Sequence, residues 1–174
     1  MVPGTELTTA RFFVPGGRAS SNMTLETVLL AVGERDRDRI ETLAETTAGI
    51  AGPAGATVAL AHVFTKSEYE EARSNLDFDP ASEVTPDDVA RRYVTIRELG
   101  DAMDEGDVEF TWHGRLSDED AEGEAVVALA EDVGADLVVV GGRKRSPAGK
   151  AVFGSTAQEI LLESPCPVTF VRSD

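Results

Sequence analysis

Cysteine and aromatic residues are scarce in this sequence. Of its 174 residues, one is a cysteine, Cys166, and 6% are Phe, Trp or Tyr. A single cysteine cannot form an internal disulfide, which favours a cytoplasmic location. Cys166 stands between two prolines without an activating neighbour, so we expect it to have a packing role. With few aromatic side chains, the core has to be built mainly from Val, Ala, Leu and Ile.

Basic residues are also in short supply. The chain has 32 Asp and Glu against 16 Lys and Arg, a formal net charge of −16, and only three of the basic residues are lysines. Such an acidic surface lacks the broad basic face that nucleic-acid binding requires, and we therefore expect no nucleic-acid partner. It suits a protein that stays hydrated in concentrated salt, and we therefore expect a halophilic cytoplasm. An ordinary acidic protein from a low-salt cell remains the alternative.

Long hydrophobic runs are missing as well. No segment approaches the roughly 18 apolar residues that a membrane helix needs, so no membrane association is expected. Residues 1–22 lack the apolar stretch and the small-residue cleavage site of a secretory signal, and we expect them to form a flexible tail. The remaining residues, 23–174, have the length and apolar content of a single α/β domain.

The pattern that is present is an alternation of short apolar strands with amphipathic helices. Strands are expected at 27–32, 57–64, 107–114, 136–140 and 167–171. Helices are expected at 35–52, 86–103, 117–134 and 155–164, with a short one between 66 and 82. This alternation predicts a single doubly wound, five-stranded parallel sheet with helices on both faces. Ligands of such sheets bind at the carboxyl ends of the strands, where the strand order reverses.

The segment after the fourth expected strand is the one cationic stretch in this acidic chain. Residues 143–145 read Arg-Lys-Arg, Lys150 follows, and no acid lies between Asp136 and Glu159. Gly141 and Gly142 precede it, and we expect them to let the backbone turn and approach a ligand. Gly154-Ser155-Thr156 then opens a helix, with Ser155 and Gln158 at capping-box spacing.

Glycines, free helix amides and cations that converge on one spot are what a phosphate group requires, so a small phosphorylated ligand is the first interpretation. A plain turn followed by cations that balance nearby acids, or that contact a partner chain, is the other. The loop is not a Walker motif, which would need Gly at 144 and Ser or Thr at 151, and the dinucleotide fingerprint is absent too.

These residues resemble the universal stress protein family, whose fold is shared with adenine-nucleotide alpha hydrolases. Nucleotide-binding members carry G-x-x-G, nine residues and G-[ST] after the fourth strand. Here Gly141 is the first glycine, nine residues (145–153) follow Lys144, and Gly154-Ser155 closes the pattern. The resemblance extends from about Thr27 to Arg172, and it implies the strand order 3-2-1-4-5 for the sheet. The charge suggests a haloarchaeal type.

Two positions depart from the family pattern. Lys144 replaces the second loop glycine and brings a charge where relatives allow close backbone approach. Gly33 stands at the end of the first strand, where nucleotide-binding relatives have an aspartate that contacts the nucleoside, and Asp36, three residues on, cannot be assumed to replace it. The second departure bears on recognition of the base and leaves phosphate binding untouched.

The resemblance implies ATP or another adenine nucleotide as ligand, without an evident metal. By position, the residues that would line the nucleoside and phosphate subsites are Val32, Gly33, Val63, Val140, Gly141, Arg143, Lys144, Gly154, Ser155 and Thr156. It also implies a homodimer through strand 167–171, whose apolar edge needs covering. The alternative for that edge is the N-terminal tail.

Chemistry outside the loop is hard to place. His62 lies within a buried strand, so we expect a hydrogen-bonded core histidine, and His113 is expected at the end of the third strand, near the ligand edge. No histidine pair has metal-ligand spacing, and no general base stands out, so slow nucleotide hydrolysis ranks last. Two functions remain: a nucleotide-responsive stress protein, or a relative that has lost nucleotide binding and acts as a dimeric interaction protein.

Overall fold

The computed structural model describes residues 24–142 and 154–172. The strands are β1 (Thr27–Val32), β2 (Thr57–Thr65), β3 (Phe110–Ser117), β4 (Leu137–Gly142) and β5 (Val168–Arg172). The helices are the 3₁₀ helix η1 (Glu34–Arg39), α1 (Ile40–Ala54), α2 (Lys66–Asn75), α3 (Pro86–Arg92), α4 (Val94–Glu105), α5 (Glu122–Asp132) and α6 (Ser155–Glu163). Within the described ranges, no helix combines the length and the apolar character needed to cross a bilayer.

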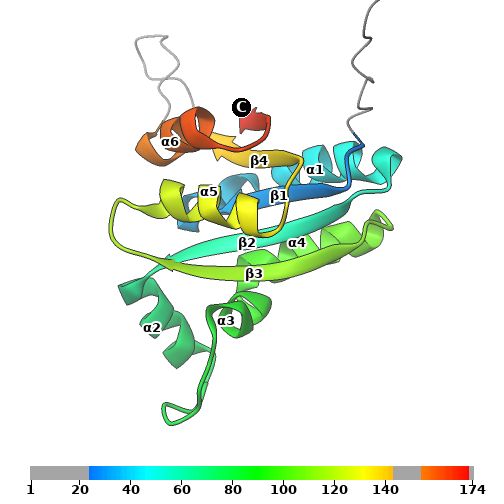
Figure 1. The fold of residues 1–174 in the computed structure, drawn as a ribbon. Coiled ribbons are helices and arrows are strands. Elements are labelled where there is room, and N and C mark those ends of the chain that lie inside the picture. The colour runs from blue at the N-terminus through cyan, green and yellow to red at the C-terminus, as the bar shows by residue number, and fades with distance from the viewer. Residues whose placement is uncertain (1–23, 143–153, 173–174) are drawn as a thin grey trace, which may run out of the picture.

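The five strands form one parallel sheet in the order β3-β2-β1-β4-β5, which confirms the predicted fold (Figure 1). Helices α1 and α4 pack on one face and α5 and α6 on the other. Helices α2 and α3 lie beside the β3 edge, where they form a small apolar cluster around Phe64. The sheet is therefore covered on both faces, as its apolar central strands require.

The central strands divide their side chains between two cores. On the α1–α4 face, Leu30 and Leu60 pack with Leu43 and Leu99, and all four are fully buried. On the α5–α6 face, Leu29 packs with residues of α5 and α6. This is the period-two alternation of a strand that is buried on both sides. Both cores therefore depend on the same two strands, β1 and β2.

The helix predicted over 35–52 differs from the observed one at both ends. Its first residues form η1, and α1 begins only at Ile40. Helix α1 continues past Gly52, with Pro53 in its last turn. It ends at Ala54, because Gly55 adopts the left-handed conformation (φ 66°) that terminates helices. The Gly52–Gly55 stretch therefore ends the helix through its last glycine.

The single helix predicted over 86–103 is two helices. Thr85 caps α3 and exchanges hydrogen bonds with Asp88, as the sequence predicted, but Tyr93 is extended (φ −66°, ψ 133°) and separates α3 from α4. Strand β3 is three residues later than predicted, and α5 is shorter, at Glu122–Asp132. The break lets α3 pack across β3, where a side chain at Gly114 would collide with the Pro86 backbone.

Candidate functional site

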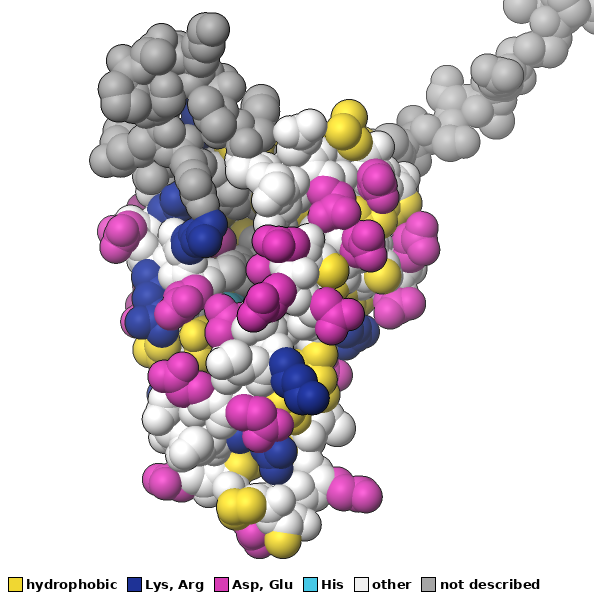
Figure 2. Space-filling model, turned by 90° about the vertical axis from the view of Figure 1, so that its left-hand side faces the viewer, with side chains coloured by type: hydrophobic (Ala, Val, Ile, Leu, Met, Phe, Trp, Pro, Cys, Tyr) yellow, Lys and Arg dark blue, Asp and Glu magenta, His cyan; other side chains and the backbone are white. Residues whose placement is uncertain are grey.

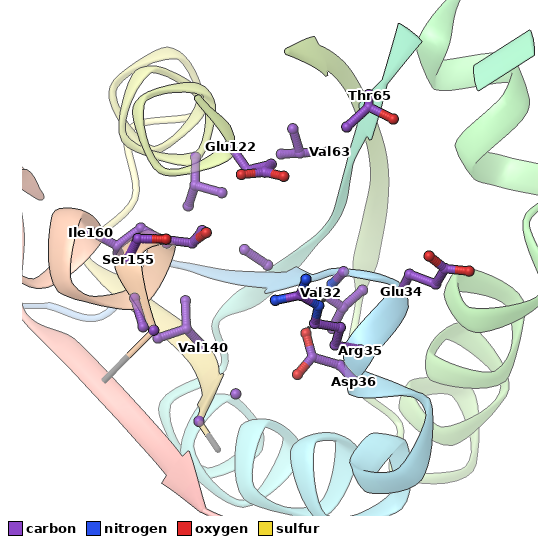
Figure 3. A pocket seen from close by; sticks show the side chains of 18 of the residues that line it. Val32, Glu34, Arg35, Asp36, Val63, Thr65, Glu122, Val140, Ser155 and Ile160 are labelled. Carbon is purple, nitrogen blue, oxygen red and sulfur yellow. Dashed lines mark hydrogen bonds between the residues drawn. The ribbon is translucent and has the colours of Figure 1, made fainter. Parts of the chain in front are cut away.

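A cavity opens at the carboxyl ends of the strands, at the point where the strand order reverses. The chain passes from β1 outward to β2 and β3, and then crosses back to β4 on the other side of β1. Pairing between β1 and β4 reaches Ala31 and Val140, beyond which the two chain segments diverge. The cavity here has a volume of about 500 Å³ (Figure 3), within the range of roughly 300–1,000 Å³ that is usual for small-molecule sites.

Three groups of residues form the cavity walls. We call Gly141, Gly142, Gly154, Ser155 and Thr156 the loop-side wall, because they flank residues 143–153. The strand-one wall consists of Val32–Asp36 and Arg39, which end β1 and form η1. The α5 wall consists of Asp120, Glu122 and Val126. Val63, Thr65 and Glu68 line the cavity from β2 and the start of α2.

Most of the site residues predicted from the sequence lie on these walls. Eight of the ten line the cavity, namely Val32, Gly33, Val63, Val140, Gly141, Gly154, Ser155 and Thr156. The other two, Arg143 and Lys144, lie outside the described residues, as do Arg145 and Lys150. Positions far apart in the sequence are thus brought to one cavity, while their roles toward a ligand stay predictions.

The loop-side wall presents backbone amides to the cavity. Gly154 is the N-cap of α6 (φ −67°, ψ 160°), so the predicted capping box of Ser155 with Gln158 is wrong: Ser155 is the first helical residue. The first helical bond runs from the Gln158 N–H to the Gly154 carbonyl, at 2.9 Å. The N–H groups of residues 155–157 precede that bond, and such first-turn amides attract anions.

The strand-one wall is held together by two charged side chains. The Gly33 N–H donates to Oδ2 of Asp36 at 2.8 Å, and Oδ1 of Asp36 pairs with Nε of Arg39 at 3.3 Å. Nη1 of Arg39 donates to the carbonyl of Gly142, so the bridge joins the end of β1 to the end of β4. Burial raises the pKa of Asp36, while the Gly33 hydrogen bond and Arg39 oppose that rise.

Gly141 and Gly142 are glycines because neighbouring side chains leave no room. A Cβ at Gly141 would collide with the Asp36 carboxylate, and one at Gly142 would collide with the Phe170 ring. Both residues belong to β4, so the prediction that they form a turn is wrong. They instead let β4 pass under the Asp36–Arg39 bridge on one side and Phe170 on the other.

Carboxylates dominate the remaining lining, a feature that the sequence reading missed. Among the described residues, five acids line the cavity (Glu34, Asp36, Glu68, Asp120 and Glu122) against two arginines (Arg35 and Arg39). Asp and Glu side chains also gather on the face shown in Figure 2. The signal was available: residues 34–36 come soon after the first strand, Asp120 precedes α5, and Glu122 is the first residue of α5.

The two histidines lie away from the cavity lining. His62 is 1% exposed, and its ring packs against Phe64 and Tyr93 at centroid distances of 4.3 and 4.5 Å. Neither ring nitrogen has a hydrogen-bond partner among the described residues, so the prediction of a hydrogen-bonded core histidine holds only for its burial. Burial lowers the pKa of His62 to about 4. His113 lies in the middle of β3 and contacts Thr111 Oγ1, which corrects its predicted place at the strand end.

No metal centre is evident in the described part of the chain, where no three His, Cys, Asp or Glu side chains are grouped to hold an ion. The chemistry of the cavity is therefore that of amides, two guanidinium groups and carboxylates. An anion fits the loop-side wall, and hydrogen-bond donors fit the α5 wall.

Comparison with known proteins gives a consistent result. The sequence profile described as the universal stress protein family matches residues 24–172. A universal stress protein of Mycolicibacterium smegmatis is 45% identical over 49 residues, a match that covers 28% of this chain and 38% of the relative.

Solved structures are similar over nearly their whole length. A universal stress protein from Archaeoglobus fulgidus has a TM-score of 0.55 and 26% identity, covering 83% of this chain and 97% of its own. A universal stress protein in complex with cAMP has a TM-score of 0.58 and 18% identity, covering 87% and 99%.

Proposed function

Because the chain belongs to the universal stress protein family, we propose that it is a stress-response protein that binds ATP or a related phosphorylated ligand in the cavity between β1 and β4. The observation that carries this proposal is the loop-side wall: the free first-turn amides of α6 face a cavity of about 500 Å³. One structurally similar universal stress protein was solved with cAMP, a ligand of the same chemical class. The phosphates would lie at Gly141 and residues 154–156, and the nucleoside at Val32, Gly33 and Val63.

The cationic segment supports the same assignment. Arg143 and Lys144 lie outside the described residues, in the segment 143–153 that links β4 to α6 in the sequence. Their charge would offset the carboxylates that line the rest of the cavity. A ligand with a phosphate at one end and hydrogen-bond donors at the other satisfies both parts of the site.

The test is the nucleotide content of the purified protein. Acid extraction followed by chromatography should release a bound nucleotide, and calorimetric titration with ATP, AMP and a cyclic dinucleotide in molar KCl should show saturable binding. An empty extract together with flat titrations would contradict the proposal.

A second candidate function is a dimeric interaction protein that has lost nucleotide binding. It is favoured by Gly33, which leaves the strand-one wall without the carboxylate of nucleotide-binding relatives. Its partner surface would be the β5 edge, which in the described chain pairs with β4 on one side only. Empty extracts and flat titrations, with dimerisation intact, would select this function.

We propose a homodimer through β5 under either function. Val168, Thr169 and Phe170 are only half-buried, and an apolar sheet edge of this kind pairs readily with a second copy. Light scattering should give twice the chain mass, and Thr169→Lys should yield monomers because two lysines would face each other across the edge. A monomeric parent protein would contradict this proposal.

From the acidic composition we propose that the protein works in a salt-rich cytoplasm. With a net charge of −16 and one cysteine, the protein suits a salt-rich cytoplasm. Its thermal midpoint should rise between 0.1 and 2 M KCl as screening relieves repulsion between the carboxylates.

We also propose that residues 23–174 fold as one domain without the N-terminal tail, so a variant lacking residues 1–22 should keep the same midpoint.

A further inference from the structure

The strand-one wall carries a guanidinium group where nucleotide-binding relatives carry a carboxylate. Gly33 brings no side chain, and a Cβ placed there would meet only Asp36 Oδ2, at 3.9 Å. Arg35 follows two residues later, lines the cavity and, in Figure 3, turns its side chain toward the cavity interior beside Val32. A guanidinium offers only hydrogen-bond donors, whereas a carboxylate offers only acceptors, so this end of the site favours ligand groups that accept hydrogen bonds.

Two of the other three charged groups of this wall, Asp36 and Arg39, are already engaged, and the third, Glu34, is a carboxylate that can only accept hydrogen bonds. Asp36 accepts from the Gly33 N–H and pairs with Arg39, and Arg39 also donates to Gly142. Within the described part of the chain, Arg35 has neither a hydrogen bond nor an ion pair. Among the described residues, Arg35 is therefore the side-chain donor of this wall that is available to a ligand.

Carboxylates share the lining of this cavity with Arg35. Glu34, Glu68, Asp120 and Glu122 all line it, and Figure 3 shows Glu122 on the wall opposite the strand-one side. So many carboxylates disfavour a second phosphate here, because like charges in a partly enclosed site repel. They favour instead a neutral group that offers donors to the carboxylates and acceptors to Arg35.

From these contacts we infer that Arg35 selects the base of the nucleotide, and that it favours guanine over adenine. Guanine presents its O6 and N7 acceptors together, the pair that arginine binds with two hydrogen bonds, and its N1–H and N2–H₂ donors suit Glu122. Adenine places an amino donor at the position of O6, which would face the Arg35 donors. The inference rests on the proposed nucleotide-binding function and adds the class of base.

The test compares two arginines of the same 3₁₀ helix. Arg37 is exposed, does not line the cavity and lies 3.5 Å from the Tyr93 hydroxyl, so Arg37→Met removes the same charge away from the site. GTP, ITP and ATP are titrated calorimetrically against the parent protein, Arg35→Met and Arg37→Met. The parent and Arg37→Met should bind GTP roughly 5- to 100-fold more tightly than ATP, as one bidentate arginine contact allows.

In Arg35→Met, the GTP preference should disappear while ATP affinity stays within about twofold. ITP, which keeps O6 and N7 but lacks the N2 amino group, should lose affinity on this substitution as GTP does. As a second variant, Gly33→Asp has room for its Cβ and should shift the preference toward ATP.

Three results would overturn the inference. ATP binding more tightly than GTP to the parent protein would contradict the base preference. An equal loss for ATP and GTP in Arg35→Met would show that Arg35 contacts phosphate. If no nucleotide binds the parent at all, the proposed function itself fails and the base preference fails with it.

Discussion

The loop-side wall and the strand-one wall face the same cavity but are built from different materials. The loop-side wall consists of glycines and the first turn of α6, with backbone amides as its main donors. The strand-one wall consists of charged side chains, among them Arg35, Asp36 and Arg39. Backbone N–H groups donate to any phosphate, whereas side chains held in a fixed position can discriminate between bases. If a nucleotide binds as proposed, the wall at the end of β4 would hold its phosphates and the wall at the end of β1 would select the rest of the ligand.

The walls should also differ in their response to acid, through the histidine beside the strand-one side. His62 pairs in register with Val32, the last residue of β1, and burial holds its pKa at about 4 against an ordinary 6.5. The unfolded chain therefore takes up a proton between these pH values that the folded chain refuses. Stability should fall by about 3 kcal/mol as the pH drops from 7 to 4, since each pKa unit is worth about 1.4 kcal/mol.

Urea unfolding at fixed salt measures this loss, and His62→Phe should abolish most of it. The matched control is His113→Gln, which should keep the acid sensitivity because His113 is less buried. Asp36 acts in the opposite direction: its pKa is raised, so its contribution to stability grows as the pH falls through that pKa. An unchanged pH slope in His62→Phe would show that the strand-one side is no more acid-sensitive than the loop side.

Removing charge from the loop should affect every nucleotide alike. Lys144→Ala with Arg145→Ala deletes two proposed phosphate contacts, each worth about 1.5–3 kcal/mol when charge-assisted. At the lower end of that range, affinity should fall roughly 150-fold for both ATP and GTP, measured by calorimetry, with the ratio of the two affinities unchanged. Arg91→Ala with Arg92→Ala, on α3, removes the same charge at a distance from the cavity and should leave affinity unaltered. A change in the ATP-to-GTP ratio would contradict the separation of roles.

The junction of the two walls should be sensitive to a single methyl group. Gly141→Ala places its Cβ against the Asp36 carboxylate and within 3.0 Å of the Arg39 Cδ. The bridge must move or break, and overpacking of this kind costs about 1–3 kcal/mol. Urea unfolding should show this loss. Nucleotide affinity should fall as well, because the Gly142 carbonyl loses its hydrogen bond from Arg39 and the loop-side wall is no longer held to the strand-one wall. Wild-type stability in the variant would mean that the bridge is easily rearranged.

The parallel sheet and most of the cavity lining were predictable from the sequence, because both follow from where the apolar strands begin and end, whereas the strand order came from the family resemblance. Apolar runs locate β1, β2 and β4, and parallel strands bring their carboxyl ends together. The glycine pattern then identifies the loop-side wall. These features are local in sequence, so a single chain is enough to find them.

The strand-one wall was not predictable in the same way, because its contacts are between distant residues. The bridge from Arg39 to Gly142 joins positions 103 residues apart. The sequence suggests that Gly141 is a turn residue. Only the structure shows that the Asp36 carboxylate packs against it and leaves no room for a side chain. Likewise, Tyr93 carries no helix-breaking signal, and the packing of α3 over β3 accounts for the break there.

The smallest expected effect compares the same substitution at the two strand ends. Gly33 is extended (φ −121°, ψ 179°), a conformation open to any residue, and a Cβ there would make only an ordinary contact at 3.9 Å. Gly33→Ala should therefore stabilise the protein by about 0.5 kcal/mol, because alanine restricts the unfolded chain more than glycine does. Urea unfolding of Gly33→Ala and Gly141→Ala in the same salt should give opposite signs. Destabilisation by both would mean that the end of β1 is as closely packed as the end of β4.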